Sequence, residues 1–147
     1  MDVEERMHAA SLPGESLSGR LVYVEDEPVN ALLMQHWAAQ YPKLTLEVAP
    51  TGATGFAACL REVPDAVLLD KRLPDMDGLD VLRQCRAAPT LAGVPLVILS
   101  ASNDVIDIEA ALSAGASAYW LKPFDFRALE RGLLDLMGKT RKTRPLR

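Results

Sequence analysis

Short apolar runs recur along the chain, separated by longer stretches in which apolar residues follow helical spacing. Four of the runs are nearly continuous, which is typical of parallel strands that are buried on both faces. The second run, LTLEV, alternates apolar and polar residues, so we expect this strand at an edge of the sheet. Strands that alternate with helices predict an α/β fold, a doubly wound parallel sheet of five strands with five helices. The expected strands cover residues 20–25, 44–48, 65–70, 95–100 and 117–121.

Residues that start and stop helices bound the segments between these strands. Pro28 suits a first helical turn, and Thr51 and Asp104 carry side chains that can cap the start of a helix. Gly115 can end the fourth helix. The expected helices cover residues 28–41, 51–63, 79–87 and 104–115, and the last helix follows Pro123.

Apolar residues at helical spacing predict which face of a helix packs on the sheet. Gly132 interrupts the last helix at a cost of about 1 kcal/mol relative to Ala, and it marks either a close contact or nothing in particular. The expected packing residues are Val29, Leu32, Leu33 and Trp37 on the first helix, Ala53, Phe56, Ala57 and Leu60 on the second, and Phe126, Leu129, Leu133, Leu136 and Met137 on the last.

One folded domain accounts for most of the 147 residues. Residues 1–19 are polar, contain Pro, Gly and Ser and show no sustained period, which predicts a flexible leader. Residues 20–138 carry the strand and helix patterns and form the predicted domain. Residues 139–147 are basic and unpatterned, and we expect a solvated tail, with docking to an acidic partner as the alternative.

Composition and charge argue against several classes of protein. The formal net charge of -4 disfavours direct nucleic-acid binding, which normally uses a basic face. The apolar stretches are shorter than a membrane span and the acidic start lacks a signal-peptide pattern, so we expect a cytoplasmic protein without membrane insertion. Cys59 and Cys85 lack metal-ligand spacing, which predicts reduced, buried thiols.

Polar or charged residues end four of the apolar runs. Glu25 and Asp26 follow the first run, Asp70 ends the third, Ser100 ends the fourth and Lys122 follows the fifth. Because the carboxyl ends of parallel strands meet at one edge of a sheet, we expect these five side chains to lie together. One such residue alone would indicate a helix cap or a turn, whereas five together indicate a site.

The residue types at this edge favour magnesium and phosphoryl chemistry. Three carboxylates repel one another unless a cation neutralises them, and a ligand set of oxygen atoms favours Mg²⁺ over zinc. With Mg²⁺ bound, Asp70 stays ionised and can act as a nucleophile towards a phosphoryl group. The Lys122 ammonium and the Ser100 hydroxyl could then stabilise the charge on the transferred group.

Four motifs in this order resemble those of a known family, the receiver domains of two-component response regulators. The acidic pair lies in VEDEPVN, the acceptor in LLDKRLPDMDGLDVL, the switch hydroxyl in LSAS and the lysine in AYWLKPF. The resemblance covers residues 20–138 and includes the single-domain receivers similar to chemotaxis regulators. It implies a flavodoxin-like strand order, 2-1-3-4-5.

The resemblance also implies how phosphorylation occurs. Asp70 would accept a phosphoryl group from a phosphohistidine on a sensor histidine kinase or a histidine phosphotransfer protein. Asp26, Asp70 and the backbone carbonyl of Arg72 would bind Mg²⁺ directly, and Glu25 would bind it through water.

Other positions of the motifs imply how the signal is read. Lys122 would bind the phosphoryl group, and its peptide bond to Pro123 would be cis. Ser100 and Tyr119 would form the switch, because the hydroxyl moves to the phosphoryl group and the ring turns into the vacated space. Ser102 stands at a position that flanks the entry of the attacking water in this family.

We therefore predict a single-domain response regulator that relays its signal to an unidentified downstream protein through a switched interaction face. It would not be an enzyme apart from its own phosphorylation and dephosphorylation. A homodimer through helix four, strand five and helix five is a further option, and Trp120 would belong to that surface or to the core. The alternatives are a constitutive adaptor or phosphate-sink receiver, and a flavodoxin-like cofactor protein, which the three carboxylates of VEDEPVN disfavour.

Overall fold

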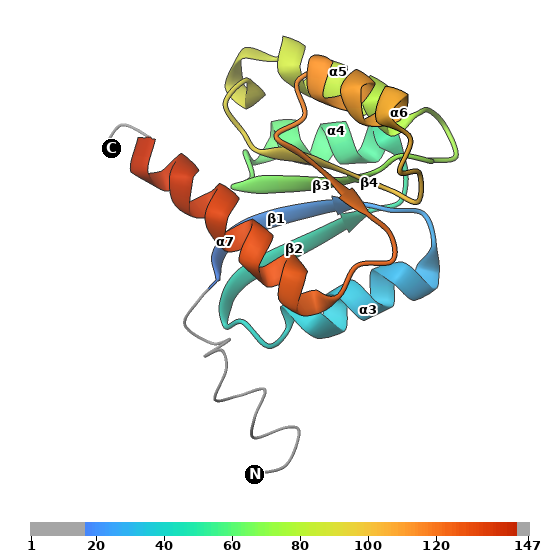
Figure 1. Cartoon of the computed structure of the whole chain (residues 1–147). Helices are drawn as coiled ribbons and strands as arrows, with labels where there is room; N and C mark the ends of the chain where they lie inside the picture. The colour runs from blue at the N-terminus through green and yellow to red at the C-terminus, as the bar shows by residue number, and fades with distance from the viewer. Residues whose placement is uncertain (1–16, 144–147) are drawn as a thin grey trace.

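The computed structural model describes residues 17–143, in which a parallel sheet lies between two layers of helices (Figure 1). Residues 1–16 of the predicted leader and residues 144–147 of the predicted tail lie outside the described part. The strands pair in the order β2-β1-β3-β4-β5 and every pair is parallel, which confirms the predicted fold with β2 at an edge. The strands are β1 (Ser18–Val24), β2 (Lys43–Ala49), β3 (Ala66–Asp70), β4 (Leu96–Ser100) and β5 (Ala118–Leu121).

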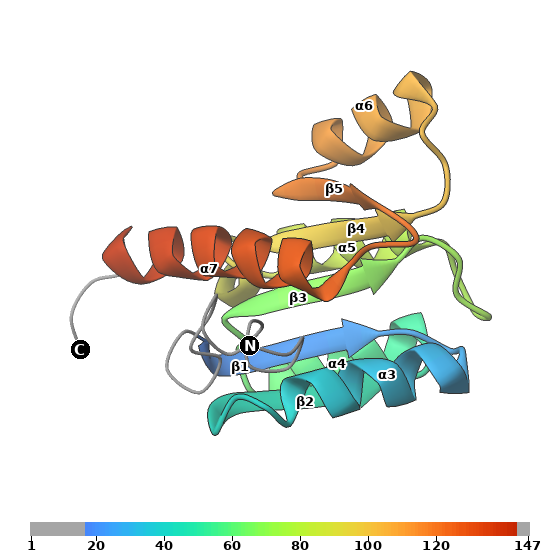
Figure 2. The same ribbon diagram turned by 60° about the horizontal axis from the view of Figure 1, so that its bottom comes forward.

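Four α-helices and one short 3₁₀-helix connect the strands, and a fifth α-helix follows β5. Helices α3 and α7 cover one face of the sheet, and α4 and α5 cover the other, as two views show (Figures 1 and 2). The helices are α3 (Pro28–Ala38), α4 (Gly52–Arg61), α5 (Gly78–Ala87), η1 (Pro89–Leu91), α6 (Val105–Ser113) and α7 (Phe126–Thr143). Among the described helices, none is long and apolar enough to cross a membrane.

Several element boundaries differ from the predicted ones. Helices α3 and α4 end at Ala38 and Arg61, before the expected ends at residues 41 and 63. Strand β1 begins at Ser18, before the expected start at residue 20. Helix α7 continues through Thr143, past residue 138 and into the segment expected to be an unpatterned tail. Residues 139–143 are Lys, Thr and Arg, which a helix can accommodate. The helix therefore continues even though this segment shows no periodic hydrophobic pattern.

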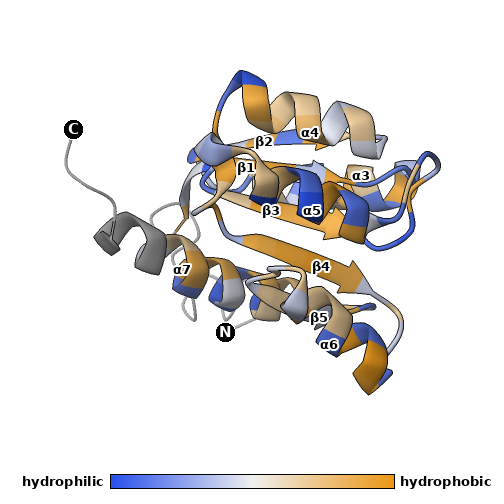
Figure 3. Ribbon diagram, turned by 90° about the horizontal axis from the view of Figure 1, so that it is seen from above, coloured by the Kyte–Doolittle hydropathy of each residue, from blue (hydrophilic) through white to orange (hydrophobic). Residues whose placement is uncertain are grey.

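The strands form a core on both faces of the sheet. Every residue of β3 and β4 is buried, as continuous apolar runs predict, and Figure 3 shows these strands as hydrophobic between the helices. Helix α7 packs through the predicted face, because Leu129, Leu133 and Met137 are buried in the core. Both cysteines are free and buried, as expected.

Helix α3 does not use the predicted face. Val29, Leu32 and Leu33 are 60%, 59% and 52% exposed, so their assignment to the core was wrong. Trp37 is buried as predicted, together with Met34. The ring of Trp37 stacks on Phe126 of α7 and meets Tyr41 edge to face, and these aromatic contacts decide which side of the helix faces inward.

Helix α4 also differs from the prediction. Ala53, Ala57 and Leu60 are exposed, while the buried residues are Gly52, Gly55, Ala58 and Cys59. Phe56 is partly buried, in agreement with the expected stripe. A Cβ on Gly55 would lie 2.5 Å from the Val24 side chain, so this helix lies against β1 through small residues. A pattern of hydrophobic residues alone cannot predict a contact that is made through glycine.

Gly132 marks a close contact, which was one of the two readings of this position. A Cβ placed on it would lie 2.4 Å from the Trp120 ring. Trp120 is half-buried and packs against the cluster shared by α3 and α7, so this indole is largely a core group. The glycine therefore lets α7 approach β5.

Replacing Gly132 by Ala should destabilise the protein, because the added methyl group overlaps the Trp120 ring. We expect the free energy of unfolding in urea to fall by about 1–3 kcal/mol, the usual cost of overpacking. Gly138→Ala is the matched control on the same helix, since nothing lies within 4 Å of a Cβ there. That control should gain up to about 1 kcal/mol from helix propensity. A Gly132→Ala variant more stable than the parent would contradict the contact.

Candidate functional site

The predicted acidic residues meet at the carboxyl edge of the sheet. Glu25 and Asp26 follow β1, and Asp70 is the last residue of β3. One carboxylate oxygen from each lies within 4.8 Å of the other two. Because β1 and β3 are adjacent and parallel, their ends bring these side chains together without any long loop.

Lys122 connects the ends of β4 and β5 to this cluster. Its Nζ donates to Asp70 Oδ1 at 3.1 Å and to Glu25 Oε1 at 3.4 Å. Its backbone amide donates to the Ser100 carbonyl at 2.8 Å. The peptide bond from Lys122 to Pro123 is cis, as expected. One ammonium group therefore faces three carboxylates.

Glu25 is held rigidly by neighbours that sequence reasoning did not identify. It is 2% exposed, and its Oε1 accepts hydrogen bonds from Asn30 Nδ2 at 2.7 Å and from the Tyr23 hydroxyl at 3.1 Å. Tyr23 lies two residues before Glu25, on the same side of the extended chain, and that spacing could have revealed it. Asn30 lies in the first turns of α3, and no sequence signal indicated its role.

The second oxygen of Glu25 tests whether this site suits a cation. Oε2 is buried and has no hydrogen-bond partner among the described residues. An unpaired buried carboxylate oxygen is costly, and a cation or its bound water would satisfy it. The donors at this edge are oxygen atoms, which suit a hard divalent cation such as Mg²⁺. The residues therefore fit the predicted metal.

Burial raises the pKa of Asp70 to about 6, and the neighbouring Glu25 adds to the effect while Lys122 opposes it. Burial also opposes the ionisation of Glu25, yet hydrogen bonds with Asp70 and Asn30 and the charge of Lys122 lower its pKa. Of the two carboxyl groups, Asp70 is therefore the more readily protonated. Binding of a cation would favour the ionised form of both.

The loop after β3 is closely packed against the end of that strand. The Arg72 amide donates to Asp70 Oδ1 at 3.4 Å, while the Arg72 side chain is exposed. A Cβ on Gly78 would lie 2.4 Å from the Asp70 carbonyl oxygen, so glycine is required there. Asp75 accepts hydrogen bonds from the amides of Gly52 and Ala53 at 2.8 and 2.9 Å, which ties the loop to the start of α4. Binding of a cation by the Arg72 carbonyl stays a prediction.

The two predicted switch residues are connected through a third residue. Ser100 is 7% exposed, and its Oγ accepts a hydrogen bond from the Ser102 amide at 3.1 Å. The Tyr119 hydroxyl donates to the Ser102 carbonyl at 2.8 Å. Both side chains thus contact the backbone of one loop residue between β4 and α6.

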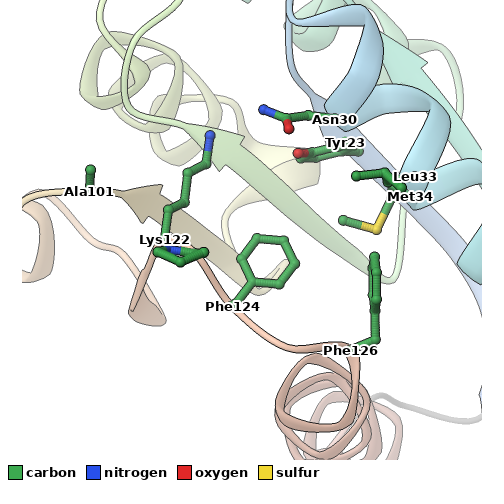
Figure 4. Close-up of a pocket in the computed structure, with 9 residues that line it drawn as sticks. Tyr23, Asn30, Leu33, Met34, Ala101, Lys122, Phe124 and Phe126 are labelled. Atoms are coloured by element: carbon green, nitrogen blue, oxygen red, sulfur yellow. The ribbon is translucent and has the colours of Figure 1, made fainter.

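A cavity of about 350 Å³ lies beside this edge (Figure 4). Lys122, Tyr23 and Asn30 bring its polar end to the carboxylates, as their contacts with Glu25 show. The opposite end is apolar. The lining residues are Tyr23, Asn30, Leu33, Met34, Ala101, Lys122, Pro123, Phe124 and Phe126. An incoming group could therefore reach the site along an apolar wall.

Comparisons with known proteins agree with this geometry. Residues 21–133 match the family model of the response regulator receiver domain. The chain is 38% identical over 120 residues to the probable transcriptional regulatory protein TcrX of Mycobacterium tuberculosis. That match covers 82% of this chain and 50% of TcrX, so the chain spans about half the length of this relative.

Two solved structures are similar over most of the chain. The receiver domain of the sensor histidine kinase PA1611 from Pseudomonas aeruginosa, which holds a magnesium ion in its active-site cleft, is 30% identical with a TM-score of 0.75. That match covers 83% of this chain and 99% of the other. The BeF₃-activated receiver domain of RstA from Klebsiella pneumoniae is also 30% identical, with a TM-score of 0.73 and coverage of 80% and 97%.

Removing the charge of Asp70 should stabilise the metal-free protein at neutral pH. An acid with a raised pKa contributes stability that is present below its ordinary value of 3.8 and is lost as the pH rises through about 6. Asp70→Asn should therefore raise the free energy of unfolding at about pH 7.5 by on the order of 1–2 kcal/mol, and the gain should vanish near pH 4. Urea titrations with a chelator present measure this.

Mg²⁺ provides the control for that pH experiment. The cation should stabilise the parent and have little effect on Asp70→Asn, which has lost a carboxylate of the cluster. If metal-free Asp70→Asn is less stable than the metal-free parent at about pH 7.5, this would contradict the raised pKa of Asp70.

Proposed function

Since the chain belongs to the response regulator receiver family of two-component signalling, we propose that Asp70 is its phosphoryl acceptor. The observation that carries this proposal is the contact of Lys122 Nζ with Asp70 Oδ1 inside the cluster formed with Glu25 and Asp26. A nucleophilic carboxylate, a metal-binding pair and a cation for the transferred group then lie at one sheet edge.

Mg²⁺ would be held by the carboxylates of Glu25, Asp26 and Asp70, with the Arg72 carbonyl as a further ligand and Glu25 acting through water. When bound, the cation would neutralise negative charge and keep Asp70 ionised. Asn30 and Tyr23 fix the orientation of Glu25, because both donate to its Oε1. The protein thus positions its carboxylates before any phosphodonor arrives.

In the transfer step an oxygen of Asp70 forms a bond to phosphorus while the bond from phosphorus to the donor nitrogen breaks. The electron pair of the breaking bond stays on the imidazole of a histidine kinase or phosphotransfer protein. Lys122 Nζ, which lies 3.1 Å from Asp70 Oδ1, would bind an oxygen of the transferred group, and the Ser100 hydroxyl would move to donate to another. The contacts of Ser100 and Lys122 with that group distinguish the two states of the switch.

The signal would be read on the face made by α6, β5 and α7. Tyr119 lies in β5 and contacts the loop before α6, so a movement of Ser100 can reach this face through Ser102. The downstream protein and a homodimer would both use this surface. We propose that the receiver relays its signal to that protein through this face, and the chain spans about half the length of its relative TcrX.

Phosphorylation should require both Asp70 and Mg²⁺. Acetyl phosphate with Mg²⁺ should label the parent, while Asp70→Asn should give background signal because an amide is not a nucleophile towards phosphorus. A chelator should remove the labelling of the parent. Intact-mass spectrometry at short reaction times measures the phosphorylated fraction.

The matched control for the labelling experiment is Asp80→Asn. Asp80 is an exposed carboxylate on α5 that pairs with Arg83 at 3.2 Å and does not belong to the cluster of Glu25, Asp26 and Asp70. It should be labelled as the parent is. If Asp70→Asn is labelled equally well, another residue is the acceptor. In a separate experiment, the rates at which different histidine kinases transfer a phosphoryl group to the parent protein would identify the natural donor.

Phosphorylation should change partner binding if the chain is a relay. Beryllofluoride with Mg²⁺ mimics a phosphoryl group on an aspartate, so immobilised protein should recover a different amount of its downstream partner with the mimic than without it. Quantitative mass spectrometry of the recovered proteins measures this, with Asp70→Asn as the control that should not respond. Equal recovery from the parent in both conditions would support the constitutive adaptor or phosphate sink.

A further inference from the structure

Ser102 uses all of its polar atoms to join the switch to helix α6. Its amide donates to Ser100 Oγ at 3.1 Å, and its carbonyl accepts from the Tyr119 hydroxyl at 2.8 Å. Its hydroxyl donates to Asp107 Oδ2 at 2.6 Å and accepts from the Asp104 amide at 3.2 Å. One loop residue therefore touches both switch side chains and the first turn of the helix.

Helix α6 has little apolar packing to hold it. Ala111 is its one buried residue, and Figure 2 shows the helix beside β5 at the end of the sheet. Three of its large apolar side chains are well exposed, with exposed fractions of 64% for Val105, 73% for Ile106 and 49% for Leu112. Its first turn is capped by Asp104, which accepts from the Ile106 amide at 2.9 Å at the start of the helix, whereas the Ser102 to Asp107 hydrogen bond joins this turn to the preceding loop.

We propose that the Ser102 to Asp107 hydrogen bond is a latch that holds α6 in the position that it has in this structure. If Ser100 moves towards a phosphoryl group on Asp70, the Ser102 amide must follow its acceptor or lose it. If Ser102 follows, its hydroxyl leaves Asp107 unless α6 moves as well. The latch therefore opposes the switch until the new phosphoryl contacts overcome it.

This inference rests on the proposed function and adds a positioning residue, Asp107, to it. An interaction made in one state alone shifts the equilibrium by its own free energy, so loss of the latch should favour the switched state. A hydrogen bond to a partly exposed carboxylate should change the apparent affinity for a phosphoryl mimic about five-fold. The direction of the effect is specific, because damage to the site would weaken binding of the mimic instead.

The experiment measures the affinity of the full chain for beryllofluoride at saturating Mg²⁺, by tryptophan fluorescence. Ser102→Ala and Asp107→Ala should each bind the mimic about five-fold more tightly than the parent. The double variant should bind no more tightly than either single variant, because both substitutions remove the same bond. Ser102→Thr keeps the hydroxyl and should restore the affinity of the parent.

Asp104→Ala is the matched control, because it removes one carboxylate and a helix cap from the same turn but leaves both latch groups in place. Its affinity should stay within about two-fold of the parent. An equal gain in Asp104→Ala, additive single substitutions or unchanged latch variants would overturn the latch while leaving the proposed function standing. A parent that does not bind beryllofluoride with Mg²⁺ would overturn both.

Discussion

Charge imbalance at the carboxyl edge of the sheet governs the chemistry of this protein. Three carboxylates lie close together there, and one ammonium, that of Lys122, contacts two of them. Burial and the neighbouring Glu25 raise the pKa of Asp70, and among the described residues the buried Oε2 of Glu25 has no hydrogen-bond partner. A divalent cation would correct both, since it supplies positive charge and a partner for oxygen. The arrangement thus makes metal binding and ionisation of Asp70 mutually dependent.

The surrounding fold is what keeps such an unfavourable cluster in place. All residues of β3 are buried, and the neighbouring strand β4 is buried along its length as well. Apolar burial of these strands supplies the stability that the charged edge lacks. Gly78 lets the following loop close over the Asp70 carbonyl, and the Asp75 cap ties that loop to α4. Asp70 is therefore held in place by groups that lie outside the acidic cluster.

The strands were more predictable from sequence than the helix faces, for a physical reason. A continuous apolar run, such as the one that ends at Asp70, is favourable only between two layers of helices. The sequence therefore also predicts where this strand ends in the sheet. Helix α3 is apolar around much of its surface, and ring contacts with Tyr41 and with Phe126 of α7 favour burial of Trp37 while Leu32 stays exposed. Helix α4 packs through Gly55, which carries no hydrophobic signal. The hydrogen bond from Asn30 to Glu25 depends on the three-dimensional arrangement of β1 and α3, which no local sequence pattern predicts.

The contrast between α5 and α6 explains how a small chemical event could move part of this molecule. Helix α5 buries Leu79, Val81, Leu82 and Cys85, so its displacement would expose much apolar surface. Helix α6 buries Ala111 and otherwise depends on polar contacts at its first turn. A phosphoryl group can shift an equilibrium only by its differential interaction with the two states, which a few hydrogen bonds supply. A phosphoryl group can therefore release a helix that is held by only a few hydrogen bonds. Helix α6 is held in this way, whereas α5 is held by its buried apolar side chains.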